Sequence, residues 1–178
     1  RNDTVSESSG WSKDRWLPPD PTWKQDVGEG STSPIVVGNR VYVLGWRNKQ
    51  DVLSCLDTKT GNVLWSTSYD CPRYGRYATG DEGLYSGPTS TPEYDESTGF
   101  LYTLSCDGNL NCWDTKKQGM LVWSISLYDR FQIGRRPRVG RSGLRDYGYT
   151  TAPLVYGDWV IVEVGAKEGS LVAFSKTN

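Results

Sequence analysis

The side chains that could carry out catalysis are few in this chain, because its 178 residues include no histidine. Within this sequence, that excludes a serine or cysteine nucleophile activated by histidine, a histidine-ligated zinc site and imidazole acid–base chemistry. Tyrosine, lysine and carboxylate side chains are present, but no pair of them stands at a spacing that indicates a mechanism. We therefore expect no catalytic residue in this segment.

Four cysteines are the other reactive groups, at positions 55, 71, 106 and 112. If all of them pair, three disulfide connectivities are open. Cys55 and Cys112 occupy one position of an internal repeat, which Ala173 fills in a third copy, so we expect them to be reduced thiols in small buried strand positions. Cys71 and Cys106 are candidates for a bridge across a loop, and the sequence leaves their disulfide state open. Since no Cys-x-x-Cys occurs, we expect no metal or redox site.

An arginine-rich segment between Asp129 and Thr150 is the candidate binding region. Guanidinium groups and aromatic faces suit an anionic ligand, a sugar-like ligand or a protein partner. The alternative interpretation, which we favour from the sequence alone, is a solvated insertion. The residues of this candidate ligand or partner site are Arg135, Arg136, Arg138, Arg141, Tyr147 and Tyr149.

Charge and hydropathy exclude two kinds of partner. The 20 basic and 21 acidic residues give a net charge of -1, so we expect no nucleic acid partner. No stretch approaches the roughly 18 apolar residues of a transmembrane helix, so we expect no transmembrane segment. A signal peptide pattern is also absent from this segment.

Three similar units follow one another along the chain at a spacing of about 60 residues. Each begins with a small residue and a proline before two short β-rich runs, at Pro34, Pro92 and Pro153. A second signature follows the first two hairpins, with an aspartate, a glycine and a tryptophan at similar spacing. These residues are Asp57, Gly61 and Trp65 in the first copy, and Asp114, Gly119 and Trp123 in the second.

Each copy holds four short β-rich runs separated by turn residues, which predicts a four-stranded antiparallel meander. Such a sheet is the unit of a β-propeller, and neighbouring sheets must stack to bury their faces. We therefore expect an all-β fold, a β-propeller of nearly three blades. Residues 1–22 are expected to be a flexible lead-in, with blades at about 23–70 and 71–128 and a truncated blade at 129–178. Because three blades cannot close a ring, we expect the segment to belong to a longer protein.

The pattern from Cys55 to Trp65 resembles the tryptophan-docking motif of the PQQ-like, or quinoprotein-type, β-propeller repeat family. The overall likeness is to BamB-like repeat proteins of the kind found in planctomycete bacteria. This resemblance implies a parent of seven or eight blades in the periplasm or cell envelope. It also implies structural roles for the motif residues: the tryptophan packs between blades, and the aspartate and glycine shape the turn.

The expected function is a non-catalytic binding or scaffold module of the cell envelope. The alternative is part of a PQQ-dependent dehydrogenase whose active-site residues lie outside this segment. The resemblance implies that such an enzyme carries vicinal cysteines and a calcium site of Glu, Asn and Asp. Because the sequence has no Cys-Cys pair and no acidic cluster, we expect no cofactor and no bound metal here.

The lengths of the predicted connections single out one face of the propeller. The segments between copies are long, from about Cys71 to Pro88 and from Asp129 to Thr150, whereas turns such as Gly38-Asn39 at the opposite end are short. Long loops on a rigid scaffold are where binding residues gather. We therefore expect any ligand or partner to bind at the face that carries the long connections.

Overall fold

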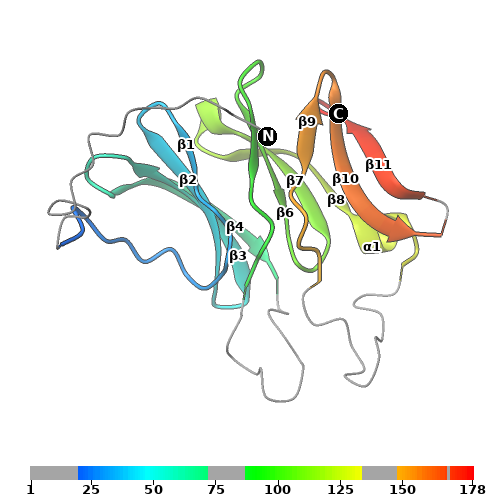
Figure 1. Cartoon of the computed structure of the whole chain (residues 1–178), viewed down its shortest axis with the longest axis horizontal. Helices are drawn as coiled ribbons and strands as arrows, with labels where there is room; N and C mark the ends of the chain where they lie inside the picture. Colours follow the sequence, from blue (N-terminus) through cyan, green and yellow to red (C-terminus); the bar gives the residue numbers. More distant parts are fainter. Residues whose placement is uncertain (1–19, 72–86, 134–147, 168) are drawn as a thin grey trace, which may run out of the picture.

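Three antiparallel sheets follow one another in a computed structural model that describes residues 20–71, 87–133, 148–167 and 169–178 (Figure 1). The first sheet has the order β1 (Ile35–Val37), β2 (Arg40–Arg47), β3 (Gln50–Asp57) and β4 (Val63–Asp70). The second has the order β5 (Glu93–Asp95), β6 (Phe100–Leu104), β7 (Asn109–Asp114) and β8 (Met120–Ser126). The third contains β9 (Leu154–Tyr156), β10 (Trp159–Ala166) and β11 (Gly169–Ser175).

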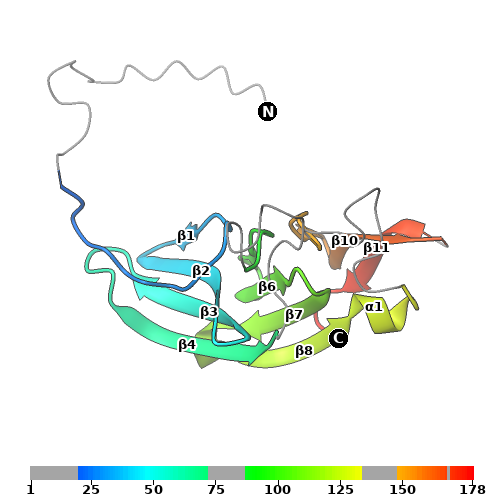
Figure 2. The same ribbon diagram turned by 90° about the horizontal axis from the view of Figure 1, so that it is seen from below.

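Two short helical turns interrupt this pattern among the described residues: the 3-10 helix η2 (Thr115–Lys117) and the α-helix α1 (Leu127–Arg130). Neither helix, nor any other in the described part of the chain, has the length and apolar character that crossing a membrane requires. Figure 2 shows the sheets side by side. The strands of the first two sheets follow one another in the same direction, from β1 to β4 and from β6 to β8.

The strand register confirms the internal repeat. One repeat position on the third strand is filled by Cys55, Cys112 and Ala173. In each copy this residue pairs with the equivalent residue of the second strand. The partners are Tyr42, Tyr102 and Ile161, respectively. The pairing of the third and fourth strands also shifts immediately after Cys55 and after Cys112. A bulge repeated at one position bends both sheets in the same way.

The aspartate of the repeated motif shapes the turn between the third and fourth strands. The Asp57 carboxylate accepts hydrogen bonds from the backbone N–H of Lys59 at 3.0 Å and of Thr60 at 2.9 Å. Gly61 then adopts a φ of +71°, in the left-handed region that glycine tolerates. An aspartate that binds the next backbone N–H groups is a common turn initiator.

The second copy builds the same turn with one extra residue. Asp114 accepts hydrogen bonds from the backbone N–H of Lys116 and Lys117, and Gly119 has a φ of +75°. The additional residue, Gln118, takes the left-handed conformation at a φ of +55°. The insertion is therefore absorbed as a second left-handed residue, and the fourth strand starts in the same relation to the third.

The hydrophobic core lies between the sheets. Tyr42, Leu53 and Cys55 of the first sheet pack with Leu101 and Trp113 of the second. A second cluster joins the second sheet to the third through residues that are almost entirely buried: Tyr102, Leu104, Leu110, Cys112, Val160, Val162 and Val164. Full burial of a Leu or Val side chain stabilises a fold by about 1.5 to 3 kcal/mol. Because both clusters draw on two sheets, each sheet depends on its neighbour for stability.

The third sheet is covered on one face only in the described structure. Its opposite face exposes Leu154, Tyr156, Trp159 and Leu171. Ala173 is exposed as well, although the equivalent Cys55 and Cys112 are fully buried. The position is therefore a buried one only where another sheet packs against it.

The glycine of the motif turn marks the place where neighbouring sheets touch. A Cβ atom built on Gly119 would lie 2.5 Å from Cζ3 of Trp65, which belongs to the preceding sheet. Gly157, in the turn between β9 and β10, has a similar φ of +56° but nothing within 4 Å of its Cβ direction. A substitution at Gly157 therefore tests backbone strain alone. A substitution at Gly119 tests the same strain together with crowding against the Trp65 ring.

We predict that Gly119→Ala destabilises the protein more than Gly157→Ala does. The left-handed backbone alone costs an alanine about 1 to 2 kcal/mol at either site. Displacing the Trp65 ring should add about 1 to 3 kcal/mol, as overpacking does elsewhere. Free energies of unfolding from denaturant titration measure both losses. Equal losses for the two variants would show that the contact between Trp65 and Gly119 contributes nothing to stability.

Candidate functional site

The two ends of the sheets differ in the connections that they carry. At one end lie the short turns between β1 and β2, β5 and β6, and β9 and β10, at the top of Figure 1. At the other end the chain leaves β4 and β8 for the next sheet, as expected. We call this second end the long-loop face. Its described residues are 26–29, 47–49, 71, 87–89, 105–108, 127–133, 148–151, 163–167 and 169.

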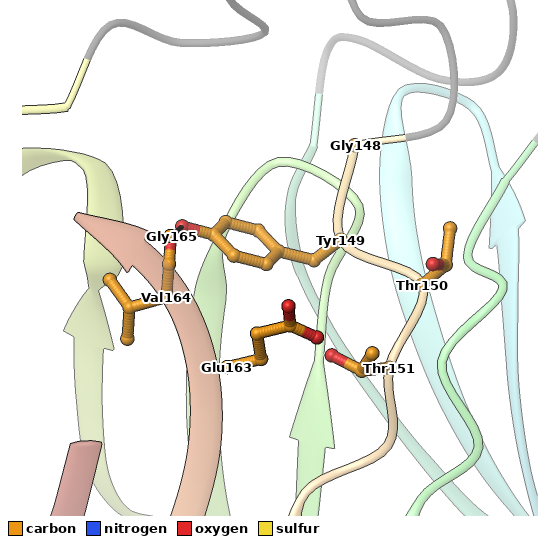
Figure 3. A pocket seen from close by; sticks show the side chains of 7 residues that line it. All are labelled: Gly148, Tyr149, Thr150, Thr151, Glu163, Val164 and Gly165. Carbon is orange, nitrogen blue, oxygen red and sulfur yellow. Dashed lines mark hydrogen bonds between the residues drawn. The ribbon is translucent and has the colours of Figure 1, made fainter. Parts of the chain in front are cut away.

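A cavity of about 450 Å³ opens on the long-loop face beside β10 (Figure 3). One wall is the segment Gly148–Thr151, which leads into the third sheet, and the other is the end of β10 from Glu163 to Gly165. Figure 3 shows the Glu163 carboxylate and the Thr151 side chain pointing toward one another. The cavity thus offers a carboxylate and hydroxyl groups at an exposed edge.

Tyr149 forms the wall of this cavity and also has a structural role. Its side chain is 9% exposed, its ring lies 5.4 Å from that of Tyr128, and its hydroxyl donates a hydrogen bond to the Val164 carbonyl at 2.9 Å. Its backbone N–H donates to the Cys106 carbonyl at 3.2 Å. This tyrosine therefore joins the second sheet to the third, and its hydroxyl is already engaged.

A second cavity, of about 520 Å³, lies on the other side of the same hairpin and shares Gly165 with the first. It is lined by residues that follow α1, including Phe131 and Gln132, and by two exposed cations, Arg130 and Lys167. A third cavity, of about 580 Å³, lies at the turn between β2 and β3. All three of these cavities open on the long-loop face.

The predicted arginine site lies almost wholly outside the described residues. Arg135, Arg136, Arg138, Arg141 and Tyr147 belong to residues 134–147, and only Tyr149 is described. The described residues on either side, Ile133 and Gly148, both line cavities of the long-loop face. The assignment of these arginines to a ligand or partner therefore stays a prediction.

The opposite end carries one cavity between the first and second sheets, of about 530 Å³. Its lining includes Arg40, Tyr42, Trp65, Tyr94 and Lys116. The rings of Tyr42 and Tyr94 are stacked 6.1 Å apart. Most of these side chains also belong to the core between the sheets, so this cavity is a gap along their junction.

Two tryptophans of the repeat, Trp23 and Trp123, dock through the indole N–H, whereas the buried indole N–H of Trp65 has no hydrogen-bond partner among the described residues. The indole N–H of Trp123 donates to the Lys176 carbonyl of the third sheet at 3.3 Å. The indole N–H of Trp23 donates to the Thr58 carbonyl of the first sheet at 3.0 Å, and a Cβ on Gly61 would collide with its ring. Trp23 therefore contacts the first sheet as the fourth-strand tryptophan of a preceding copy would, which the sequence analysis missed.

The two predicted docking tryptophans differ in burial. Trp65 is 8% exposed and packs against Tyr42 at a ring distance of 5.8 Å, whereas Trp123 is only partly buried against Tyr102 at 5.9 Å. Gly119 covers the ring of Trp65. Trp123 instead lies against the backbone of Lys176, whose carbonyl accepts a hydrogen bond from its indole N–H.

Comparison with known proteins agrees with this architecture. Residues 20–74 match a family model described as outer membrane protein assembly factor BamB. BamB from Moraxella catarrhalis is similar in structure, with a TM-score of 0.50 and 21% identity over 83% of this chain and 35% of that chain. A europium-containing methanol dehydrogenase has a TM-score of 0.54 and 19% identity over 87% of this chain and 25% of that chain. No curated protein sequence matches.

Both structures are β-propellers, so the three sheets are blades of a partial propeller. Residues 20–74 resemble a PQQ-like repeat of the BamB type, and the rest of the described chain shares the propeller fold. It spans 35% and 25% of the lengths of the two solved relatives. The expected fold and the resemblance to BamB-like repeats are thereby confirmed.

Four aspartates of the blades are engaged in turns or are buried. Asp57, Asp95 and Asp114 each accept hydrogen bonds from their own turn. Asp51 is fully buried, accepts a hydrogen bond from the Tyr69 hydroxyl at 2.8 Å, and has its pKa raised by burial. The described residues include no group of three or more His, Cys, Asp or Glu side chains arranged to hold a metal ion.

Asp95 and Lys176 tie the second blade to the third. Lys176 Nζ lies 3.1 Å from Asp95 Oδ2 and donates a hydrogen bond to Ser97 Oγ at 2.9 Å, and both charged side chains are largely buried. Burial alone would raise the pKa of Asp95, but hydrogen bonds from Thr98, Ser97 and Lys176 outweigh it and lower the pKa from 3.8 to about 2. The ionised carboxylate is thus favoured in the folded state.

We predict a loss of stability in acid that depends on Asp95. Because its folded pKa is depressed, its contribution is complete above the unfolded value of 3.8 and disappears as the pH falls toward about 2. Wild type should exceed Asp95→Asn in free energy of unfolding at neutral pH, and the two should converge across that acidic window. Denaturant titrations at a series of pH values measure the difference. A difference that stays constant down to pH 2 would contradict the assignment.

Proposed function

We propose that the protein is a non-catalytic binding propeller of the cell envelope that holds a protein partner at its long-loop face. The observation that carries this proposal is the group of three cavities at that end of the blades, two of which meet at Gly165. A set of neighbouring hollows over several blades suits a partner that reaches across the face. A single small ligand is instead held in one deep pocket.

The chemistry of the described face is compatible with a polar partner. Exposed cations stand at Arg47, Lys49, Arg130 and Lys167, and exposed acids stand at Asp26, Glu29, Asp129 and Glu163. Of these, Arg47 is already paired with Asp26 at 3.0 Å. Mixed exposed charges favour specific orientation of a partner and a fast encounter. The arginines at positions 135, 136, 138 and 141 add four positive charges to the connection between the second and third blades.

The comparisons support the same proposal at the level of the family. The matching model is described as an outer membrane protein assembly factor, which is a role in contact with other proteins at the envelope. Four aspartates of the blades, Asp51, Asp57, Asp95 and Asp114, are used in turns or are buried, so these four are poor candidates for catalysis. The proposal therefore favours partner binding over the dehydrogenase alternative.

The test is capture of partners from envelope extract by the full-length protein and by a triple variant, Arg135→Ala, Arg136→Ala and Arg138→Ala. We predict that the variant loses most capture at low salt, and that wild-type capture weakens as salt rises, because exposed charges are screened over about 8 Å at physiological ionic strength. Stability should change by less than about 0.5 kcal/mol. The matched control replaces the same three arginines by lysine, which keeps the charge but removes the guanidinium fork.

Two results would contradict the proposal. Equal capture by wild type and the alanine variant at low salt would mean that the arginine segment is a solvated insertion. A change in the absorbance of added pyrroloquinoline quinone with calcium, on mixing with the full-length protein, would favour the dehydrogenase alternative. Binding of the triple variant and wild type to a panel of acidic glycans distinguishes a protein partner from an anionic sugar.

A further inference from the structure

We infer that Cys71 and Cys106 are a redox pair that forms a disulfide between the first and second blades. Cys71 follows the last residue of β4, and Cys106 lies in the turn between β6 and β7. Both are present as thiols rather than as a disulfide in this structure, and they are at most 1% exposed. They form a separate buried cluster with Trp46, on the side of the blade junction that faces the long loops.

The two thiols are in contact. Cys71, Cys106 and Trp46 make up one buried cluster, so the two cysteine side chains pack against one another in the same small space. The Cys71 sulfur is also 3.5 Å from the hydroxyl of Ser105, the residue directly before Cys106. A sulfur held this close to its partner and to the partner's neighbour needs only a small rotation to form a bond.

The backbone on both sides is fixed, so the pair is held in place. The Cys71 N–H donates to the Lys49 carbonyl at 2.8 Å, and the Cys71 carbonyl accepts from the Trp46 indole at 2.8 Å. The Cys106 carbonyl accepts from the Tyr149 N–H at 3.2 Å. The disulfide would therefore link β4 of one blade to the β6–β7 turn of the next, where the third blade also makes contact.

The surroundings of Cys71 decide when the bond forms. The Cys71 thiol donates to Asp107 at 4.0 Å and lies near the buried Asp51. The hydrogen bond to Cys106, burial and the Asp51 charge all raise the pKa of the Cys71 thiol. Because the thiolate is the attacking species, oxidation of the folded protein is slow. The bond therefore forms fastest while the blades dock during folding.

The reaction is an ordinary dithiol oxidation. The two thiols lose two protons and two electrons and form one S–S bond, and a disulfide oxidant such as oxidised glutathione accepts them and becomes two thiols. Such oxidants operate outside the cytoplasm. The chemistry itself needs only the chain and the oxidant, so it stands or fails independently of the proposed binding function.

The test is refolding of the full chain in a glutathione redox buffer, followed by thiol counting in denaturant and peptide mapping without reductant. We expect two free thiols in place of the four present in the sequence, and a linked peptide pair that contains Cys71 and Cys106. Cys55 and Cys112 lie in two different core clusters, and they serve as the internal control that stays reduced. Four free thiols after refolding, or a bond that includes Cys55 or Cys112, would overturn the inference.

A second measurement uses stability. A disulfide constrains the unfolded chain, so the thermal midpoint of the oxidised protein should fall when dithiothreitol is added. Cys106→Ser should unfold at or below the midpoint of the reduced wild type, because the site is buried, and its midpoint should not respond to reductant. An oxidised wild type whose midpoint is unaffected by reductant would contradict a bond between the blades. If the variant does not fold, the thiol count on wild type still decides the question.

Discussion

The structure depends on the docking of each blade onto the next. A four-stranded sheet has two faces to bury, and the core clusters of this chain lie between sheets, so no blade is complete without its neighbour. The tryptophan at the fourth strand is the largest element of this contact, since it places an indole ring over the turn of the following blade. Turn geometry, cysteine positions and interblade ion pairs all follow from that packing.

The turns show how local chemistry serves the junction. Asp57 and Asp114 fix the backbone N–H groups of their turns and so bring a left-handed glycine to the surface that meets an indole. The third copy has Ser175 in place of the aspartate, and there the Lys176 carbonyl accepts from both Tyr102 and Trp123. The turn after the third strand of each blade therefore offers the tryptophan of the preceding blade one of two surfaces. It is either a glycine without a side chain or a backbone carbonyl that accepts a hydrogen bond.

Much of the fold was predictable from the sequence, because the repeat contains prolines, aspartates and glycines that strongly favour turns at fixed positions. The proline-led hairpins, the Asp and Gly turns and the position shared by Cys55 and Cys112 all lie in equivalent places in the structure. Trp23 was missed because it stands much closer to Pro34 than Trp65 stands to Pro92. This difference in spacing conceals that the two tryptophans occupy equivalent positions. Contact between Cys71 and Cys106 was beyond sequence reasoning, since it depends on how two separate blades pack. The arginine site remains a prediction, because the identity of a ligand is not encoded in loop composition.

The central claim is that neighbouring blades form one cooperative unit through the docked tryptophan. Native-state hydrogen exchange of Trp65→Ala tests this most directly, because it reports the opening of each strand separately. Loss of the ring should lower protection in β3 of the first blade and in β6 and β7 of the second by similar factors. Loss of protection confined to β3 and β4, with the second blade unchanged, would contradict the claim.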